Sequence, residues 1–512
     1  MPLPRVIVTG ASGFVGRHLL ADLKDDHRIF AIARRSQHRA GVPDHPNITW
    51  WEADIGDRRQ IEAAFRAIRE AGGADSVVHL AAHYDFTGHD HPEYWRTNVD
   101  GLRHVLDLCA ELPISRFIFT SSLAASKFPS LGRALNENSA PDGDHVYARS
   151  KRKGEELLQE YQERVPSVIV RLAALFSDWC EYPPLFMFLN AWLSTTWNAR
   201  ILGGRGLSAV PYLHVRDAVA FLRRVLERQT QFTGCDVLIA SPDGAVSHRE
   251  LFGTATLAYF GKRREPLFMP RALCGPGMWA RDVLGRLAGH RPFERPWMAR
   301  YIDLEMRVDA GLTRQMLDWM PRARLGILRR LPFLVENLKT DPLEWNRRNQ
   351  AAMKAAFVSD YLKIYWLLQK HEAEILVSFN DALTSPERAE KFASYQRLSA
   401  STHGWNHRMI VRQLLNAVRT GDKTVFTSYC RDVAMRRFEE GFRAEEFCGA
   451  VELLNLICLR VLRRDPESGG MRQQMLDYLT MTLRFGCDEA QETFEEMAAR
   501  RRGDQRPVSA IQ

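Results

Sequence analysis

The sequence predicts a doubly wound α/β fold, in which helices cover both faces of a parallel sheet, followed by an all-α helical bundle. Through the first part of the chain, short apolar runs rich in β-branched residues alternate with helical patterns, as in parallel sheets. A glycine-rich turn separates the first of these runs from the first helical pattern. Beyond residue 342, glycine turns and β-branched runs give way to long amphipathic helical patterns.

The composition is that of a globular protein of several domains. The chain has 512 residues, of which 45% are hydrophobic and 26% charged, and the net charge of +8 is not gathered into Lys/Arg runs. These values argue against a nucleic-acid partner and against a transmembrane segment. The eight cysteines lack CxxC or zinc-ligand spacing, so we expect reduced thiols and no metal site. Because the first strand starts near the N-terminus, we expect no signal peptide and a cytoplasmic protein.

The first strand is expected at Arg5–Thr9, and three glycines spaced by three residues follow it. In such a loop the first glycine permits a tight turn, the second leaves room for a pyrophosphate, and the third lets the helix pack on the strand. The phosphates bind the helix N-terminus. The pattern favours a Rossmann-like dinucleotide-binding fold, although an ordinary strand-to-helix turn is the alternative. The predicted cofactor loop comprises Gly10, Gly13, Phe14, Val15 and Gly16.

Two arginines follow the second predicted strand, Arg28–Ala33. At this position an acidic residue would bind the ribose 2′-hydroxyl of NAD. A carboxylate would repel a 2′-phosphate, whereas Arg34 can pair with one and Arg35 can stack or pair beside it. The sequence therefore predicts NADP(H), with NAD possible; the alternative is that both arginines are solvated loop residues.

Two further buried strands, at Ile48–Glu52 and Ser76–Leu80, are followed by residues suited to the same ligand. After the first strand, a carboxylate and a backbone amide can hold the adenine edge, but that carboxylate can equally cap a helix. After the second, small side chains let the cofactor lie close to the backbone. These residues are Asp54, Ile55, Ala81 and Ala82.

The candidate catalytic residues are Ser122, Tyr147 and Lys151. A strand at Arg116–Thr120 delivers Ser122 to the sheet edge where ligands bind in open α/β folds. Spacing of i and i+4 puts Tyr147 and Lys151 on one helix face. A nearby cation lowers the pKa of a phenol and makes it a usable general acid/base, and the serine can donate a hydrogen bond to the substrate oxygen. Tyr-x-x-x-Lys alone is more often a surface pair, and the motif gains its weight from the glycine loop and the serine strand that precede it.

Together these motifs resemble the extended short-chain dehydrogenase/reductases, the NAD(P)-dependent epimerase/dehydratase family, over roughly residues 4 to 335. The resemblance implies a catalytic triad of Ser122, Tyr147 and Lys151, the glycine loop as cofactor site, and Asp54 and Ile55 at the adenine. Two later segments look like the family's segments of the same shape, namely Tyr212–Ala218 and Met316–Pro321.

One segment departs from the family pattern. Many members that act on sugar nucleotides carry a Tyr-Gly-Pro type loop after the strand ending at Leu172, whereas this chain has Leu175–Trp179. This difference argues against a nucleotide-sugar substrate. The segments Phe186–Leu193 and Leu267–Leu287, expected in a small substrate domain, are apolar. An apolar substrate is one interpretation of these segments and a shallow membrane-surface dock is another, but such segments more often form the domain's own core.

We predict a domain boundary near Pro342, with an oxidoreductase domain at 1–340 and a helical domain at 343–505. Amphipathic stripes over 353–368, 409–418, 425–442 and 447–462 indicate a bundle. The run Phe438–Phe442 is similar to the helical sensor domains of bacterial stressosome co-antagonist proteins. We expect this domain to form a homo-oligomer or bind a protein partner, with small-molecule sensing as the alternative.

The sequence therefore predicts an NADP(H)-dependent oxidoreductase that transfers a hydride to or from a carbonyl or carbinol of a small, apolar metabolite, with Tyr147 as acid/base. One alternative is a nucleotide-sugar epimerase/dehydratase. The other is a redox-sensing regulatory protein, in which the dinucleotide fold is the sensor and the helical domain the output. A complete serine, tyrosine and lysine set favours an enzyme, because a sensor needs no proton donor.

Overall fold

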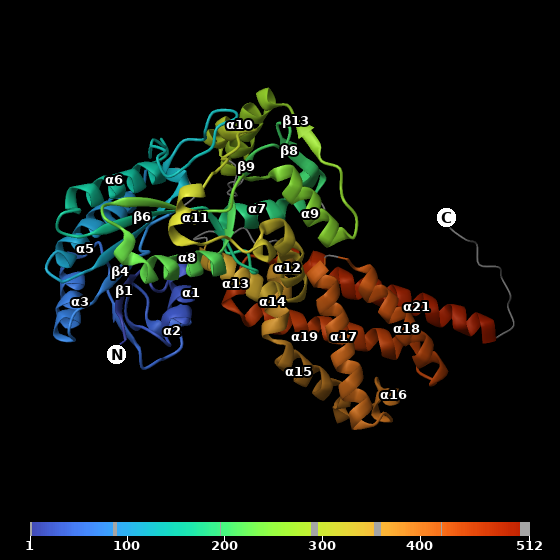
Figure 1. Cartoon of the computed structure of the whole chain (residues 1–512). Coiled ribbons are helices and arrows are strands. Elements are labelled where there is room, and N and C mark those ends of the chain that lie inside the picture. The colour runs from blue at the N-terminus through green and yellow to red at the C-terminus, as the bar shows by residue number, and fades with distance from the viewer. Residues whose placement is uncertain are drawn as a thin grey trace. The chain divides into compact units, whose positions relative to one another are not determined.

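The computed structural model describes residues 3–84, 90–194, 196–287, 295–352, 360–420 and 422–501. The chain, drawn in Figure 1, divides into two compact units. Unit 1 is Met1–Leu338 with Arg348–Lys354, and unit 2 is Lys339–Arg347 with Ala355–Gln512. The division therefore runs through one helix, α13 (Pro342–Ala352).

Unit 1 is built on a seven-stranded parallel sheet with the order β11-β6-β5-β4-β1-β2-β3. The order reverses between β1 and β4, and the crevice at such a switch point is where open α/β sheets bind ligands. The predicted doubly wound parallel sheet is confirmed. The strands are β1 (Arg5–Thr9), β2 (Arg28–Ala33), β3 (Ile48–Glu52), β4 (Ser76–His79), β5 (Arg116–Ser122), β6 (Ser167–Leu172) and β11 (Asp236–Ala240).

The first three strands have the predicted bounds, and the next two differ at their ends. Strand β4 ends at His79, one residue early. Strand β5 continues past the predicted end at Thr120, because Ser121 and Ser122 pair with Arg171 and Leu172 of β6. The serine predicted to follow the strand is therefore its last residue.

Helices cover both faces of the sheet, and alternate strand residues feed two separate cores. Val6 and Val8 of β1 pack into one core with Leu19 of α1, whereas Ile7 packs into the other with Phe65 of α3. This alternation is the pleat of a strand buried on both faces. The helices that carry the argument are α1 (Phe14–Leu23), α3 (Arg58–Glu70), α5 (Gly101–Cys109), α6 (Val146–Tyr161) and α8 (Val215–Glu227).

The rest of unit 1 forms a smaller second part, the one that the sequence predicts to bind the substrate. It contains α7 (Pro183–Trp192), β8 (Ile201–Gly203), α9 (His248–Phe260), β13 (Leu267–Met269), α10 (Arg271–Leu287) and the 3-10 helix η5 (Pro296–Tyr301). Of the two apolar segments, the first is largely core, since Phe186, Leu189 and Trp192 are buried. The second is not, since Phe268 and Trp279 are exposed.

Unit 2 is helical, as predicted. Its principal helices are α14 (Asp360–Lys370), α15 (Glu372–Thr384), α17 (Ala400–Thr420), α18 (Thr424–Glu439), α19 (Ala444–Arg464) and α21 (Met481–Arg501). Their apolar faces share one core, and a Cβ at Gly486 of α21 would lie 2.5 Å from the Phe426 ring of α18. Of the predicted stripe over 353–368, residues 353–359 lie outside the described residues. Among the helices that the structure describes, none combines the length and hydropathy needed to cross a bilayer.

Candidate functional site

The glycine loop is held tightly between β1 and the chain that follows β4. Gly10 has φ +70°, and a Cβ there would lie 2.6 Å from the Ala81 nitrogen. A Cβ at Gly16 would lie 2.5 Å from the Gly10 oxygen. Two of the three predicted glycines are therefore required by the backbone itself, whatever the loop binds.

The N-terminus of α1 is suited to an anion. Gly13 is its N-cap residue and forms no side-chain cap hydrogen bond, and the first turn, with Phe14 and Val15, contains no acidic residue. The positive end of a helix without such compensation binds phosphate groups well. The residues present thus fit the diphosphate of a dinucleotide.

Arginine side chains gather beside this loop. Arg35 donates from Nε to Ser12 Oγ at 3.4 Å, and Arg34 is half-exposed with Nη1 4.0 Å from Glu93 Oε2. The pKa of Arg35 is lowered, first by burial and then by the charges of Arg17 and Arg34. Guanidinium groups that depress one another's pKa favour a bound anion.

The residues after β3 and β4 lie at the same edge of the sheet. Asp54 accepts a hydrogen bond from Arg96 Nη2 at 2.8 Å, and Ile55 is buried. The alternative that Asp54 caps a helix is wrong, because Asp57 is the N-cap of α3. Ala82 is exposed and lines the cavity described below, as expected for a residue that leaves room for a ligand.

Ser122, Tyr147 and Lys151 come together in the fold. Ser122 ends β5 and forms a hydrogen bond with Tyr147 in the first turn of α6. The Lys151 Nζ donates to the Thr120 carbonyl at 2.8 Å and lies 5.9 Å from the centroid of the Tyr147 ring. The His145 side chain accepts the Ala148 N–H and so starts the helix that carries both residues.

Burial dominates the proton affinities of this set. It raises the pKa of Tyr147 to about 12, against the opposing effect of the hydrogen bond with Ser122. It lowers the pKa of Lys151 to about 8, although the Glu155 carboxylate opposes this. The expectation that the cation lowers the pKa of the phenol is therefore not met by these side chains alone. At neutral pH the phenol is protonated and can donate a proton.

A cavity of about 1,260 Å³ opens at the tyrosine. Phe14, Ser122 and Tyr147 line one side of it, and the smaller part of unit 1 contributes apolar side chains. Its volume exceeds the usual range of about 300–1,000 Å³ for small-ligand sites. The apolar lining includes Phe188 and Trp192 of α7, Met278 of α10, and Trp297 and Met298 of η5.

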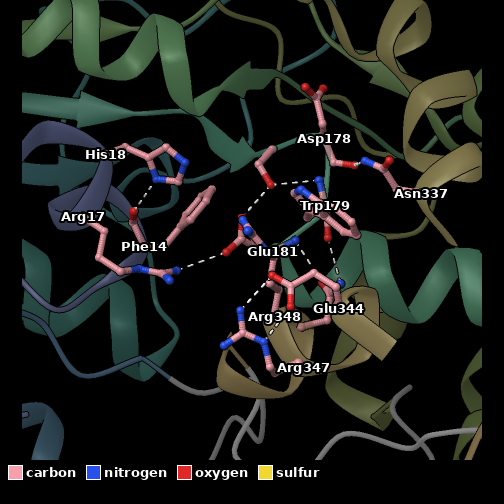
Figure 2. Close-up of polar contacts among 12 residues, drawn as sticks. Phe14, Arg17, His18, Asp178, Trp179, Glu181, Asn337, Glu344, Arg347 and Arg348 are labelled. Atoms are coloured by element: carbon pink, nitrogen blue, oxygen red, sulfur yellow. Dashed lines mark hydrogen bonds and ion pairs between the residues drawn. The ribbon is translucent and has the colours of Figure 1, made fainter. Parts of the chain in front are cut away.

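A buried carboxylate that the sequence did not single out lies beside the glycine loop (Figure 2). The Glu181 side chain is 2% exposed and accepts hydrogen bonds from Arg17 at 3.1 Å and from Ser177 at 2.6 Å; Arg348 lies 4.0 Å away. Its backbone N–H donates to Asn349, whose amide donates to the Trp179 carbonyl. Glu181 has φ +52°, and the preceding Cys180 has φ +72°. These contacts hold the backbone of a strained turn in place. The turn directly follows Leu175–Trp179, the segment that departs from the Tyr-Gly-Pro pattern.

Comparison with known proteins shows which family this region resembles. The family model described as the NAD dependent epimerase/dehydratase family matches residues 6–240. Residues 6–240 are thus similar to that family. Their predicted resemblance to the extended short-chain dehydrogenase/reductases is confirmed.

Three curated relatives illustrate the range of the family. The first is N-acetyl-alpha-D-glucosaminyl-diphospho-ditrans,octacis-undecaprenol 4-epimerase of Escherichia coli O157:H7. It is 32% identical over 183 residues, and the match covers 34% of this chain and 49% of the relative. A putative dihydroflavonol 4-reductase of Synechocystis is 29% identical, covering 34% and 49%. A dTDP-D-glucose 4,6-dehydratase of Mus musculus is 26% identical, covering 44% and 65%. The chain spans about half the length of the first two of these relatives.

Two solved structures share the fold. UDP-glucose 4-epimerase from Thermotoga maritima with UDP-glucose is 18% identical with a TM-score of 0.50, covering 65% of this chain and 98% of its own. dTDP-glucose 4,6-dehydratase from Bacillus anthracis in complex with NAD is 18% identical with a TM-score of 0.50, covering 69% and 99%. The names of the relatives agree better with the epimerase/dehydratase alternative than with a reductase of a small apolar metabolite.

Proposed function

We propose that this chain is an NAD(P)-dependent enzyme that interconverts a carbinol and a carbonyl, as a reductase or as the opening step of an epimerisation or dehydration. The observation that carries the proposal is that Ser122 and Tyr147 line one cavity, with the buried Lys151 Nζ 5.9 Å from the centroid of the Tyr147 ring. A protonated phenol next to a serine hydroxyl can protonate the oxygen of a carbonyl that is being reduced. The nicotinamide cofactor, when bound, supplies or accepts the hydride.

The side chains divide the work. Ser122 orients the phenol and donates a hydrogen bond toward the substrate oxygen. Tyr147 gives up its proton to that oxygen, or takes it back in the oxidative direction. Lys151 is fixed by the Thr120 carbonyl and keeps a positive charge at neutral pH, which opposes the negative charge left on the phenol.

We propose NADP(H) as the preferred cofactor, with NAD as the alternative. Support comes from Arg34 and Arg35, which stand where a carboxylate would select NAD, and from the effect of Arg17 and Arg34 on the pKa of Arg35. A 2′-phosphate would relieve the repulsion among these guanidinium groups. The glycine loop, Asp54, Ile55, Ala81 and Ala82 are proposed to hold the rest of the dinucleotide.

The substrate is proposed to carry a large apolar part, because the cavity is wide and lined by aromatic and aliphatic side chains. A sugar borne on a lipid combines this property with the epimerase chemistry named for the Escherichia coli relative. A free nucleotide sugar is the second candidate, and the name of the mouse relative favours it.

A substrate screen with the purified full chain tests the proposal. NADPH or NADH would be combined with ketosteroids, aldehydes, lipid-linked sugars and nucleotide sugars, and the reduced cofactor and the products would be followed. We expect turnover with at least one class and its loss in Tyr147→Phe, while cofactor binding is retained because only the exchangeable proton is removed. Tyr161→Phe, which removes a phenol hydroxyl from the same helix outside the cavity, is the control. Retention of most activity in Tyr147→Phe would refute the assignment.

Unit 2 is proposed as the module for assembly, through a second copy or a protein partner. Exposed apolar side chains on its helices, including Val377, Leu456 and Phe485, support this. The mass of the full chain in solution, compared with that of a fragment ending at residue 354, tests it. Equal oligomeric states would contradict the proposal.

A further inference from the structure

The helix α10 has an apolar outer face. Over residues 271–284, the part of the helix whose exposure the structure describes, the exposed residues are Arg271, Ala272, Leu273, Pro276, Trp279, Ala280, Arg281 and Leu284. The large apolar side chains are substantially exposed, at 59% for Leu273, 61% for Trp279 and 65% for Leu284. A water-facing helix normally shows the reverse arrangement, with charged residues outward and apolar residues inward. Here the buried side includes a carboxylate, Asp282, which is 1% exposed and pairs with Arg295 at 3.0 Å.

The neighbouring strand extends this face. Leu267 and Phe268 of β13 are 53% and 44% exposed. Gly277 of α10 lies against Met269 of β13, since a Cβ there would be 3.7 Å from the Met269 sulfur. Figure 1 shows α10 and β13 together at one edge of unit 1. We call the exposed apolar side chains Leu267, Phe268, Leu273, Trp279 and Leu284 the α10 patch.

The surroundings of the α10 patch are basic. Residues 261–284 contain five Lys or Arg residues and two acidic residues, one of which is the buried Asp282. Lys262 and Arg271 are exposed. Two copies joined through this patch by a two-fold axis would bring identical basic residues together. An anionic surface complements both the apolar centre and the basic surroundings.

The other side of α10 forms a wall of the cavity. Cys274 and Met278 line the cavity that Tyr147 also lines. One helix therefore separates the proposed reaction site from the exposed apolar face. A substrate whose apolar chain is dissolved in a bilayer at this face would need to pass only α10 to reach the cavity.

We propose that the α10 patch docks on the surface of an anionic lipid bilayer, with Leu273, Trp279 and Leu284 inserted at the level of the headgroups. Basic residues around a patch of aromatic and aliphatic side chains are typical of interfacial helices. Docking does not depend on catalysis. Delivery of a lipid-borne substrate through the α10 wall rests on the proposed function.

Vesicle co-sedimentation of the full chain tests the docking. The vesicles would be phosphatidylcholine alone, or an equimolar mixture with phosphatidylglycerol. We expect stronger binding to the mixture, weakened by salt. The triple variant Leu273→Gln/Trp279→Gln/Leu284→Gln should bind at least about tenfold more weakly, because burying two methylene groups already changes an equilibrium constant by about that factor. The control Leu3→Gln/Leu131→Gln/Leu312→Gln removes three exposed leucines elsewhere and should bind as the unchanged chain does.

A second variant guards against misfolding of the first. Lys262→Glu/Arg271→Glu keeps the apolar side chains and should lose the preference for phosphatidylglycerol. The proposal is overturned if the full chain does not bind the anionic vesicles or if the triple variant binds undiminished. It is also overturned if the triple variant changes the oligomeric mass without lipid, because the patch would then join two copies. Vesicle binding without turnover on any lipid-linked substrate would support docking and count against the proposed function alone.

Discussion

The burial of Lys151 makes the stability of the protein depend on pH in a way that one substitution can isolate. The side chain is 3% exposed, and burial lowers its pKa from 10.5 to about 8. Below pH 8 both the folded and the unfolded protein carry the proton, and holding the charge in the fold costs about 3 kcal/mol by the difference in pKa. Between pH 8 and 10.5 the folded protein has released a proton that the unfolded chain still binds, so the free energy of unfolding rises with pH.

The variant Lys151→Met has no such group. We therefore expect the free energy of unfolding of the wild-type protein, relative to the variant, to increase by about 3 kcal/mol as the pH rises from 8 to 10.5. Urea unfolding followed by circular dichroism at a series of pH values measures this difference, in which all other titrations cancel. Lys153→Met, two residues along the same helix, removes a half-exposed lysine and should show no such change. A wild-type-to-variant difference that stays constant with pH would refute the reasoning.

Three further predictions concern the cofactor loop and its surroundings. Arg34→Asp should reverse a preference for NADPH over NADH that we expect to be about 1–3 kcal/mol, measured as two dissociation constants. Equal constants in the unchanged protein would contradict it. Glu181→Gln should lower the free energy of unfolding by about 1–3 kcal/mol, because it removes the charge that pairs with a partly buried guanidinium; Glu163→Gln, at an exposed position, should change it little. A fragment ending at residue 354 should bind NADPH and melt at a higher temperature than one ending at 340, because only the longer one keeps α13 and the bond from Asn349 to the Trp179 carbonyl; identical melting would show that this helix is dispensable.

The sheet could be predicted because its signal is local. A strand buried on both faces needs a continuous apolar run. Val6, Ile7 and Val8 form such a run, and it can be recognised without knowing which strands lie beside it. Strand ends depend on the neighbour instead. Whether β5 continues to Ser122 is decided by its pairing with Leu172, fifty residues along the chain, which no local pattern reports.

Candidate site residues could be proposed from the sequence where a residue type alone limits the chemistry. The glycines, Ser122, Tyr147 and Lys151 are recognisable from their order and spacing. Glu181 was not, because its partners Arg17 and Asn349 lie 164 and 168 residues away and its environment exists only after folding. An unusual loop in place of the family's pattern was the one signal available.

Apolar segments show a further limit of sequence. Phe186 and Trp279 both occur in runs of apolar residues, and both runs were equally compatible with a core and with a surface. In the fold the first is fully buried and the second is 61% exposed. The spacing of apolar residues along the chain does not distinguish a buried segment from an exposed one. The positions of the neighbouring helices and strands decide which face of a helix is covered.

The proton affinity of Tyr147 depends on a balance that sequence spacing does not contain. A cation at i+4 favours the phenolate, but desolvation of the phenol opposes it, and here burial prevails and raises the pKa to about 12. The same burial lowers the pKa of Lys151 to about 8. The ammonium is therefore charged at neutral pH, and its charge makes proton movement away from the phenol less costly than it would be for an isolated buried tyrosine. Burial thus keeps Tyr147 protonated when no substrate is bound, and it brings the pKa of Lys151 close to neutral pH. A protonated phenol of this kind fits a group that donates its proton when a substrate oxygen becomes basic.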